Sequence, residues 1–272
     1  MNLDYICKDF DSTLYSLSQV VGISEFAIKS ILEDDWETRF DKECERYEYI
    51  DFPEDEGFSY DFGDYIYLNA FKNRKASCHR PIVHWFHGAR TINGSDYLRY
   101  GILPLKEVYP MIQKMVDSIA QGLHIAPKEC CSNLQNHNKR LLDFKLNDNI
   151  QGGPFAMLMY DAAASPDEFN NHSYIDEPEI ISNYAYMLYD KEADIILSEF
   201  KKKSVPVIVE FIEPDDTINP ISVTNLVTTS IHYLYRIIHK QNIGLQGNIC
   251  FSNNGRVIPA SSIVNVYKPM RQ

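Results

Sequence analysis

The feature that most constrains the fold is the irregular order in which strand-like and helix-like segments follow one another. Residues 205–212 form the clearest strand, because six of the eight side chains are β-branched or aromatic. Residues 105–121 instead carry apolar side chains at helical spacing and predict an amphipathic helix. Since no regular strand–helix–strand repeat is present, the pattern favours an α+β fold in which helices flank a mixed, split β-sheet.

The remaining elements follow from the same two periodicities. Gly22 separates a pair of short helices in residues 10–33, and Ser24 is placed to cap the second. Asp176 and Glu179 have the spacing of a capping box at the start of a further helix. Strands are expected at 64–70, 81–87, 155–160, 248–251 and 262–267, helices also at 176–189, 193–202 and 224–240, and irregular chain at 34–64 and 127–153.

The composition changes near residue 64. Residues 34–64 are acidic and aromatic, whereas the chain beyond them carries most of the expected strands. We therefore predict a small helical and irregular N-terminal extension, residues 1–63, followed by an α+β domain, residues 64–272.

Charge and composition exclude several classes of protein. The net charge of −12 argues against extended nucleic-acid binding, and the cationic run 201–203 is typical of a helix C-terminus. Neither a secretion signal nor an apolar stretch of about 20 residues is present, so no membrane association is expected. The six scattered cysteines lack a disulfide framework, which favours reduced thiols and a cytoplasmic location.

Metal and common enzyme signatures are also missing. The sequence holds no Walker A loop, dinucleotide-binding glycine motif, HExxH or GxSxG pattern. His79 and His87 share one face of the expected strand, whereas His84 points to the other, and no CxxC pair stands nearby. No metal site is therefore predicted.

The strongest candidate site is the segment 83–91 (VHWFHGART) followed by 100–104 (YGILP). Gly88 has no Cβ, so a ligand can approach the backbone there. His87 can donate a hydrogen bond to a ribose hydroxyl or an amide carbonyl, and Arg90 offers a planar fork to a phosphate. The alternative is a structural histidine at the end of a strand, beside a glycine that serves only the turn.

This pattern resembles the first motif of ADP-ribosyltransferases of the poly(ADP-ribose) polymerase type and their bacterial toxin and defence relatives. The resemblance implies an ADP-ribosyltransferase-like fold and NAD as the substrate. It also implies that His87 contacts the nicotinamide ribose and that the backbone of Gly88 holds the carboxamide. The cofactor-binding residues it implies are His87, Gly88, Ala89, Arg90, Gly101, Gly153 and Phe155.

Two further segments are similar to the same family. Residues 152–156 (GGPFA) resemble the strand whose tyrosine stacks on nicotinamide, with Phe155 in the place of the tyrosine and Tyr160 as the alternative. Residues 246–251 (QGNICF) resemble the penultimate strand, which a catalytic glutamate commonly begins. Gln246 and Asn248 stand there instead, and neither supplies a negative charge to the transition state.

Two functions therefore remain open. One is NAD-dependent ADP-ribosyl transfer, or NAD hydrolysis, with His87, Phe155, Gln246 and Asn248 as catalytic residues. The other is a catalytically inactive module that binds a nucleotide or a partner protein. A related RNA phosphotransferase is a third alternative, against which the acidic balance counts.

Overall fold

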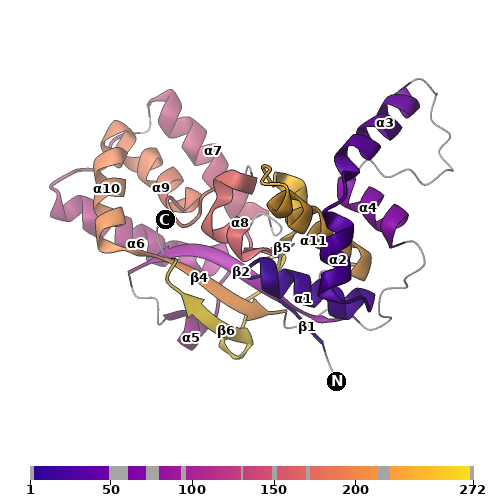
Figure 1. Ribbon diagram of the computed structural model, residues 1–272. Coiled ribbons are helices and arrows are strands. Elements are labelled where there is room, and N and C mark those ends of the chain that lie inside the picture. Colours follow the sequence, from indigo (N-terminus) through magenta and orange to yellow (C-terminus); the bar gives the residue numbers. More distant parts are fainter. Residues whose placement is uncertain are drawn as a thin grey trace.

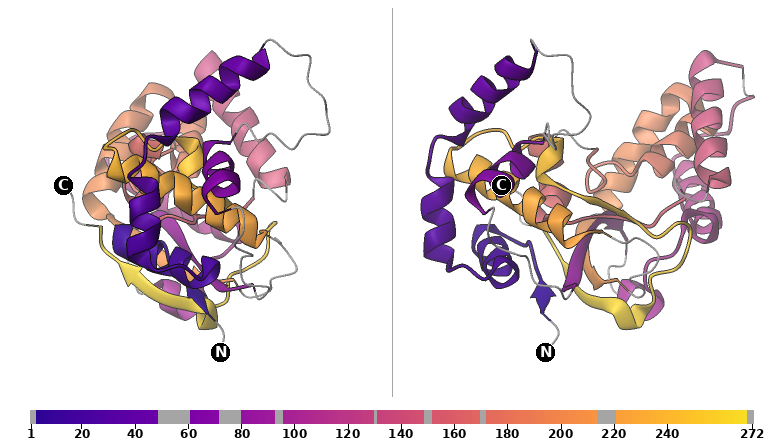
Figure 2. Two further views of the ribbon diagram at one scale, coloured as in Figure 1. Left: turned by 45° about the vertical axis from the view of Figure 1, so that its right-hand side comes forward. Right: turned by 90° about the vertical axis from the view of Figure 1, so that its right-hand side faces the viewer.

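The computed structural model describes residues 3–48, 61–71, 80–92, 96–129, 131–148, 152–169, 172–213 and 221–269. A β-sheet runs between two groups of helices (Figure 1). Figure 2 shows the N-terminal helices and α11 on one side of the molecule, and the helices of residues 105–147 and 179–203 on the other.

Within the described residues the sheet has six strands: β1 (Asp4–Tyr5), β2 (Ile82–Thr91), β3 (Phe155–Met157), β4 (Val205–Ile212), β5 (Cys250–Ser252) and β6 (Ile263–Tyr267). Five of them lie in the order β5-β3-β2-β4-β6 with antiparallel neighbours, and β1 pairs with β2 in parallel. The expected α+β class with a mixed sheet and flanking helices is therefore confirmed. In the described part of the chain the pairing path is continuous, and the expected split in the sheet is not present.

Strand β2 is longer than the sequence predicts. It pairs with β4 residue by residue from His84 opposite Ile212 to Thr91 opposite Val205. The prediction that the strand ends in a turn after His87 is wrong, because this ladder extends for four more residues. His87 consequently lies inside the sheet.

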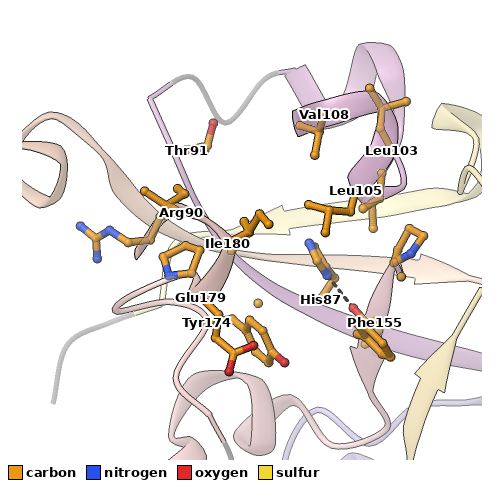
Figure 3. Close-up of a pocket in the computed structure, with 18 of the residues that line it drawn as sticks. His87, Arg90, Thr91, Leu103, Leu105, Val108, Phe155, Tyr174, Glu179 and Ile180 are labelled. Carbon is orange, nitrogen blue, oxygen red and sulfur yellow. Dashed lines mark hydrogen bonds between the residues drawn. The ribbon is translucent and has the colours of Figure 1, made fainter. Parts of the chain in front are cut away.

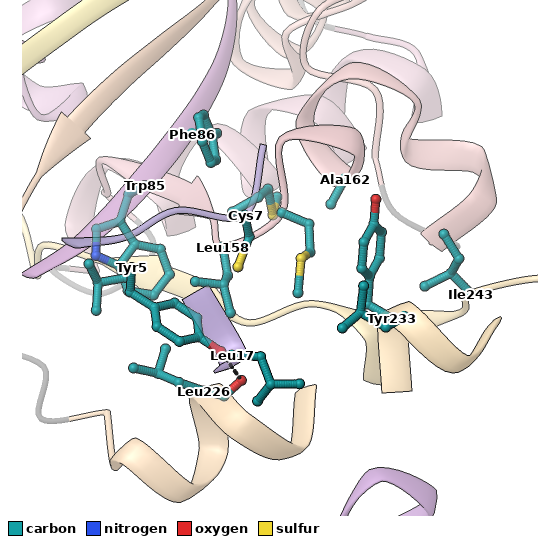
Figure 4. Close-up of a cluster of buried hydrophobic side chains, with 14 of the residues drawn as sticks. Tyr5, Cys7, Leu17, Trp85, Phe86, Leu158, Ala162, Leu226, Tyr233 and Ile243 are labelled. Atoms are coloured by element: carbon teal, nitrogen blue, oxygen red, sulfur yellow. Dashed lines mark hydrogen bonds between the residues drawn. The ribbon is translucent and has the colours of Figure 1, made fainter. Parts of the chain in front are cut away.

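The first group of helices consists of α1 (Phe10–Val21), α2 (Glu25–Leu32), α3 (Trp36–Glu48), α4 (Phe62–Ala70) and α11 (Val223–Ile238). Gly22 ends α1 in the left-handed conformation, and the Ser24 side chain caps α2, as predicted. Tyr5, Trp85 and Leu226 meet in one buried apolar cluster (Figure 4). Residues from the predicted extension thus share a core with the strands, and the boundary at residue 63 falls in the first turn of α4.

Three local predictions of secondary structure are wrong, two in this first group of helices and one in the second group. Residues 64–70 form helix α4 rather than a strand, because Asp61 accepts hydrogen bonds from the N–H groups of Gly63 and Asp64 and caps a helix. Residues 36–48 form α3, where the sequence predicts irregular chain. Residues 133–147 likewise form a helix, α7 (Asn133–Asn147), which a capping box of Ser132 and Gln135 opens.

The second group comprises α6 (Leu105–Gly122), α7, α9 (Glu179–Tyr189) and α10 (Ala193–Lys203), which bury a separate apolar cluster. The three lysines 201–203 occupy the last turn of α10, as predicted. The capping-box prediction for α9 is wrong: Pro178 is the N-cap, and the carboxylate of Asp176 accepts a hydrogen bond from Ser173 instead.

Short elements complete the fold: α5 (Asp96–Tyr100), α8 (Tyr160–Ala164), and the 3-10 turns η1 (Pro166–Phe169), η2 (Asp190–Glu192), η3 (Leu245–Gly247) and η4 (Ala260–Ser262). Strand β3 ends at Met157 and Tyr160 begins α8, so the strand predicted at 155–160 is confirmed only in its first half. Within the described ranges, no helix has the length and apolarity needed to cross a membrane.

Candidate functional site

A cavity of about 840 Å³ lies between the two apolar clusters. Its walls come from β2, β3, α6 and the segment that leads into α9 (Figure 3). This volume is typical of sites for small molecules and cofactors, which are mostly apolar with a few polar groups. Its apolar walls include Leu103, Leu105, Val108, Phe155 and Ile180.

His87 and Phe155 meet in this wall. Nδ1 of His87 lies 2.6 Å from the carbonyl oxygen of Phe155 (Figure 3). Burial lowers the pKa of His87, and the hydrogen bond to the carbonyl offsets this effect only in part. The ring is therefore neutral at physiological pH.

Gly88 and Ala89 also line the cavity, but Gly88 has a packing role as well. A Cβ on Gly88 would lie 3.2 Å from Cγ2 of Ile175 and 3.3 Å from the carbonyl oxygen of Ala163. The missing side chain thus lets α8 and the segment before α9 pack against β2. Because Gly88 has no side chain, the backbone of β2 itself borders the cavity at this position.

Gly101 and Gly153 shape the wall through their backbones. Both have a positive φ, of 74° and 45°, a region that favours glycine. A Cβ on Gly101 would lie 1.9 Å from the carbonyl oxygen of Ile258. Ile258 is also the residue that forms an antiparallel bridge with Ile102, the neighbour of Gly101. Gly101 therefore permits a close backbone contact at the edge of the cavity.

Arg90 does not present its guanidinium to a phosphate. The side chain is buried and turned away from His87 (Figure 3). Nε donates to Oγ of Ser204 at 3.0 Å, Nη1 to the carbonyl of Ile175 at 2.8 Å, and Nη2 to the carbonyls of Lys201 and Ser204. The prediction of a phosphate-binding fork is wrong, because these protein acceptors hold the guanidinium and join β2 to the end of α10.

Gln246 and Asn248 lie outside the cavity lining. Gln246 is exposed on η3, and the Asn248 side chain accepts a hydrogen bond from the N–H of Met159 at 3.1 Å. Cys250, the first residue of β5, lines the cavity in their place. Burial raises the pKa of the Cys250 thiol, so this position carries no negative charge.

The sequence pattern did not identify one charged group in the lining, Glu179, which lies on the wall across from β2. Glu179, in the first turn of α9, is paired with Lys145 of α7, and both line the cavity. Nδ1 of His172 lies 3.9 Å from the same carboxylate. Burial raises the pKa of the neighbouring Tyr174 to about 12, so its phenol stays protonated. The sequence pattern indicates only a capping role for Glu179, and its position in space alone shows that it faces the cavity.

His84 points away from this site, as its alternation with His87 predicts. Its ring is buried, and Nδ1 lies 2.6 Å from Oε1 of Glu210. Among the described residues, no three His, Cys, Asp or Glu side chains converge to hold a metal ion, and His79 lies outside those residues. Comparisons with protein-family models, curated proteins and solved structures found no match for this chain.

Proposed function

We propose that the cavity at His87 is an NAD-binding site of the ADP-ribosyltransferase type. One observation carries the proposal. His87 and Phe155, which come from two motifs that separately resemble this family, are hydrogen-bonded to each other in the wall of one cavity. The two residues stand 68 positions apart in the chain, so their meeting is a property of the fold.

The shape and chemistry of the cavity support such a ligand. Leu105, Val108 and Phe155 offer an apolar wall for a flat ring, and Gly88 leaves backbone accessible beside His87. Among the described residues, the arginine and lysine side chains in the lining are both engaged, Arg90 by protein acceptors and Lys145 by Glu179. The diphosphate of a bound dinucleotide is therefore expected at the open mouth of the cavity, where water solvates it.

Binding without transfer is the form that the geometry supports best. Gln246 and Asn248 are neutral and lie outside the lining, and Cys250 carries no charge at the corresponding wall. Glu179 favours ADP-ribosyl transfer or NAD hydrolysis as a second candidate, because a carboxylate in the wall can stabilise positive charge that develops on the ribose. Its partner Lys145 neutralises much of that field.

Calorimetric titration with NAD tests the proposal. The wild-type protein is expected to bind NAD saturably. His87→Ala is expected to remain folded at the temperature of the titration and to lose binding, and the exposed-site control His137→Ala is expected to bind normally. Absence of NAD binding by the wild-type protein would refute the proposal.

A free-nicotinamide assay separates the two forms. No nicotinamide release is expected from NAD-saturated protein. Release that depends on protein concentration and disappears in Glu179→Gln would instead establish the catalytic form.

A further inference from the structure

We infer that His87 acts in the cavity as a fixed hydrogen-bond acceptor, so that the bound ring must place an N–H or O–H donor at its Nε2. This inference rests on the proposed function and defines the end of the ligand that His87 recognises. For a nicotinamide ring the donor is the carboxamide –NH₂. The sequence suggests the reverse, a histidine that donates to the ligand.

The position of the ring proton follows from the partner of Nδ1. A backbone carbonyl only accepts hydrogen bonds, so the 2.6 Å contact with Phe155 requires the hydrogen on Nδ1. In a neutral imidazole the other nitrogen is then unprotonated and carries a lone pair. The lowered pKa of His87 keeps the ring in this neutral form.

Nε2 is available to a ligand. Among the described residues, no protein group forms a hydrogen bond with this nitrogen, and Figure 3 shows it on the side of the ring away from Phe155. The surrounding side chains are apolar or aromatic: Leu105 lies nearby in the wall, and Tyr97 packs edge-on against the imidazole with ring centroids 6.3 Å apart. A ligand that seals this wall without a donor leaves the lone pair unpaired, which disfavours its binding.

The lone pair of His87 also selects by charge. A ligand carboxylate would bring a negative charge against this acceptor, and the Glu179–Lys145 ion pair in the lining is balanced and adds no net positive charge to offset it. Neutral amides are thus favoured over carboxylates on the same ring, and also over esters, which bring no donor.

Nicotinamide and methyl nicotinate are the test pair, because they share a ring and a similar size and differ in the N–H donor. Wild-type protein is expected to bind nicotinamide about tenfold more tightly, the worth of one hydrogen bond of about 1.4 kcal/mol. In His87→Phe, which keeps a flat ring without an acceptor, the ratio is expected to fall to about one. Nicotinamide loses its hydrogen-bond partner in this variant, and methyl nicotinate no longer buries an unpaired lone pair. Thermal unfolding verifies that the variant is folded.

A measurement on the wild-type protein removes the dependence on that variant. The ¹⁵N spectrum of His87 is expected to show a protonated Nδ1 and an unprotonated Nε2, and the Nε2 signal to shift with nicotinamide but not with methyl nicotinate. Equal affinity for the two probes, binding of neither, a preference that survives in His87→Phe, or a proton on Nε2 would each overturn the inference. An amide preference in a protein that does not bind NAD would refute the proposed function alone, and NAD binding without the preference would refute this inference alone.

Discussion

Oε1 of Glu210 on β4 lies 2.6 Å from Nδ1 of His84 on β2, in the interior of the sheet. The hydroxyl of Tyr267 on β6 donates to the other oxygen of the same carboxylate. Burial by itself would raise the pKa of Glu210, but these two hydrogen bonds and the charges of His84 and Lys8 outweigh it and lower that pKa. One carboxylate thus joins three neighbouring strands.

Acid stability should depend on this carboxylate. Because its pKa is lower in the folded state than its ordinary value of 4.5, ionised Glu210 stabilises the fold above pH 4.5, and this contribution is lost as the pH falls through the folded pKa. Glu210→Gln should therefore lower the free energy of unfolding at neutral pH by about 1–3 kcal/mol and flatten its acid dependence. Chemical denaturation from about pH 3 to about pH 7 measures both, with the exposed Glu33→Gln as the unchanged control. An acid limb as steep in Glu210→Gln as in the wild type would contradict this role.

Arg90 should contribute to stability rather than to ligand binding. Replacement by alanine removes hydrogen bonds to the carbonyls of Ile175, Lys201 and Ser204 and leaves these acceptors without the guanidinium. Arg90→Ala is expected to destabilise the fold by about 3 kcal/mol or more, as measured by urea unfolding. Arg99→Ala, an exposed arginine on the nearby α5, should change stability by less than about 0.5 kcal/mol. A fully stable Arg90→Ala protein with weakened NAD binding would restore the phosphate-fork interpretation.

Gly101 and Gly122 form a matched pair of glycine substitutions. Gly101→Ala places a methyl group 1.9 Å from the Ile258 carbonyl oxygen at a φ of 74°, and the backbone conformation alone costs about 1–2 kcal/mol. A Cβ on Gly122, at the end of α6, would meet open space, so Gly122→Ala should be neutral or stabilising by up to about 1 kcal/mol. Thermal unfolding of the two variants compares them directly, and equal unfolding temperatures would show that the contact at Gly101 is not required.

Ligand affinity should fall in acid because a proton competes for Nε2 of His87. The lowered pKa of His87 keeps the acceptor neutral down to pH 6.5, so NAD affinity is expected to stay constant from about pH 8 to 6.5 and to weaken below that range. Titrations across this range measure it. Affinity that rises as the pH falls would indicate that His87 binds as a cation. The other titratable groups in the lining are Asp96, Tyr97, Lys145, His172, Tyr174, Glu179 and Cys250, together with the hydroxyl of Tyr100 and the guanidinium of Arg90.

The sequence predicts those elements whose local pattern agrees with their tertiary surroundings. Strand β4 has the predicted bounds, because its β-branched residues suit a central strand. Helix α4 was missed because its aromatic and branched residues have strand propensity, whereas the Asp61 cap and packing against α11 decide its conformation. The end of β2 was missed for a similar reason: pairing with β4, which local composition does not encode, carries the strand past His87.

The same limit applies to the site. Motif spacing points to His87 and Phe155, and the fold places both in one cavity. Motif spacing could not show that Arg90 is enclosed by carbonyls or that Glu179 reaches the cavity from α9. Both facts depend on contacts between distant segments, for which a single sequence carries no direct signal.

A crystal structure of the wild-type protein soaked with NAD tests the central claim most directly. We predict ligand density in the cavity beside β2, with a donor of the nicotinamide amide within hydrogen-bond distance of Nε2 of His87 and the ring against the wall that holds Leu105 and Phe155. A cavity filled only with water at saturating NAD, or NAD bound at another surface, would contradict the claim.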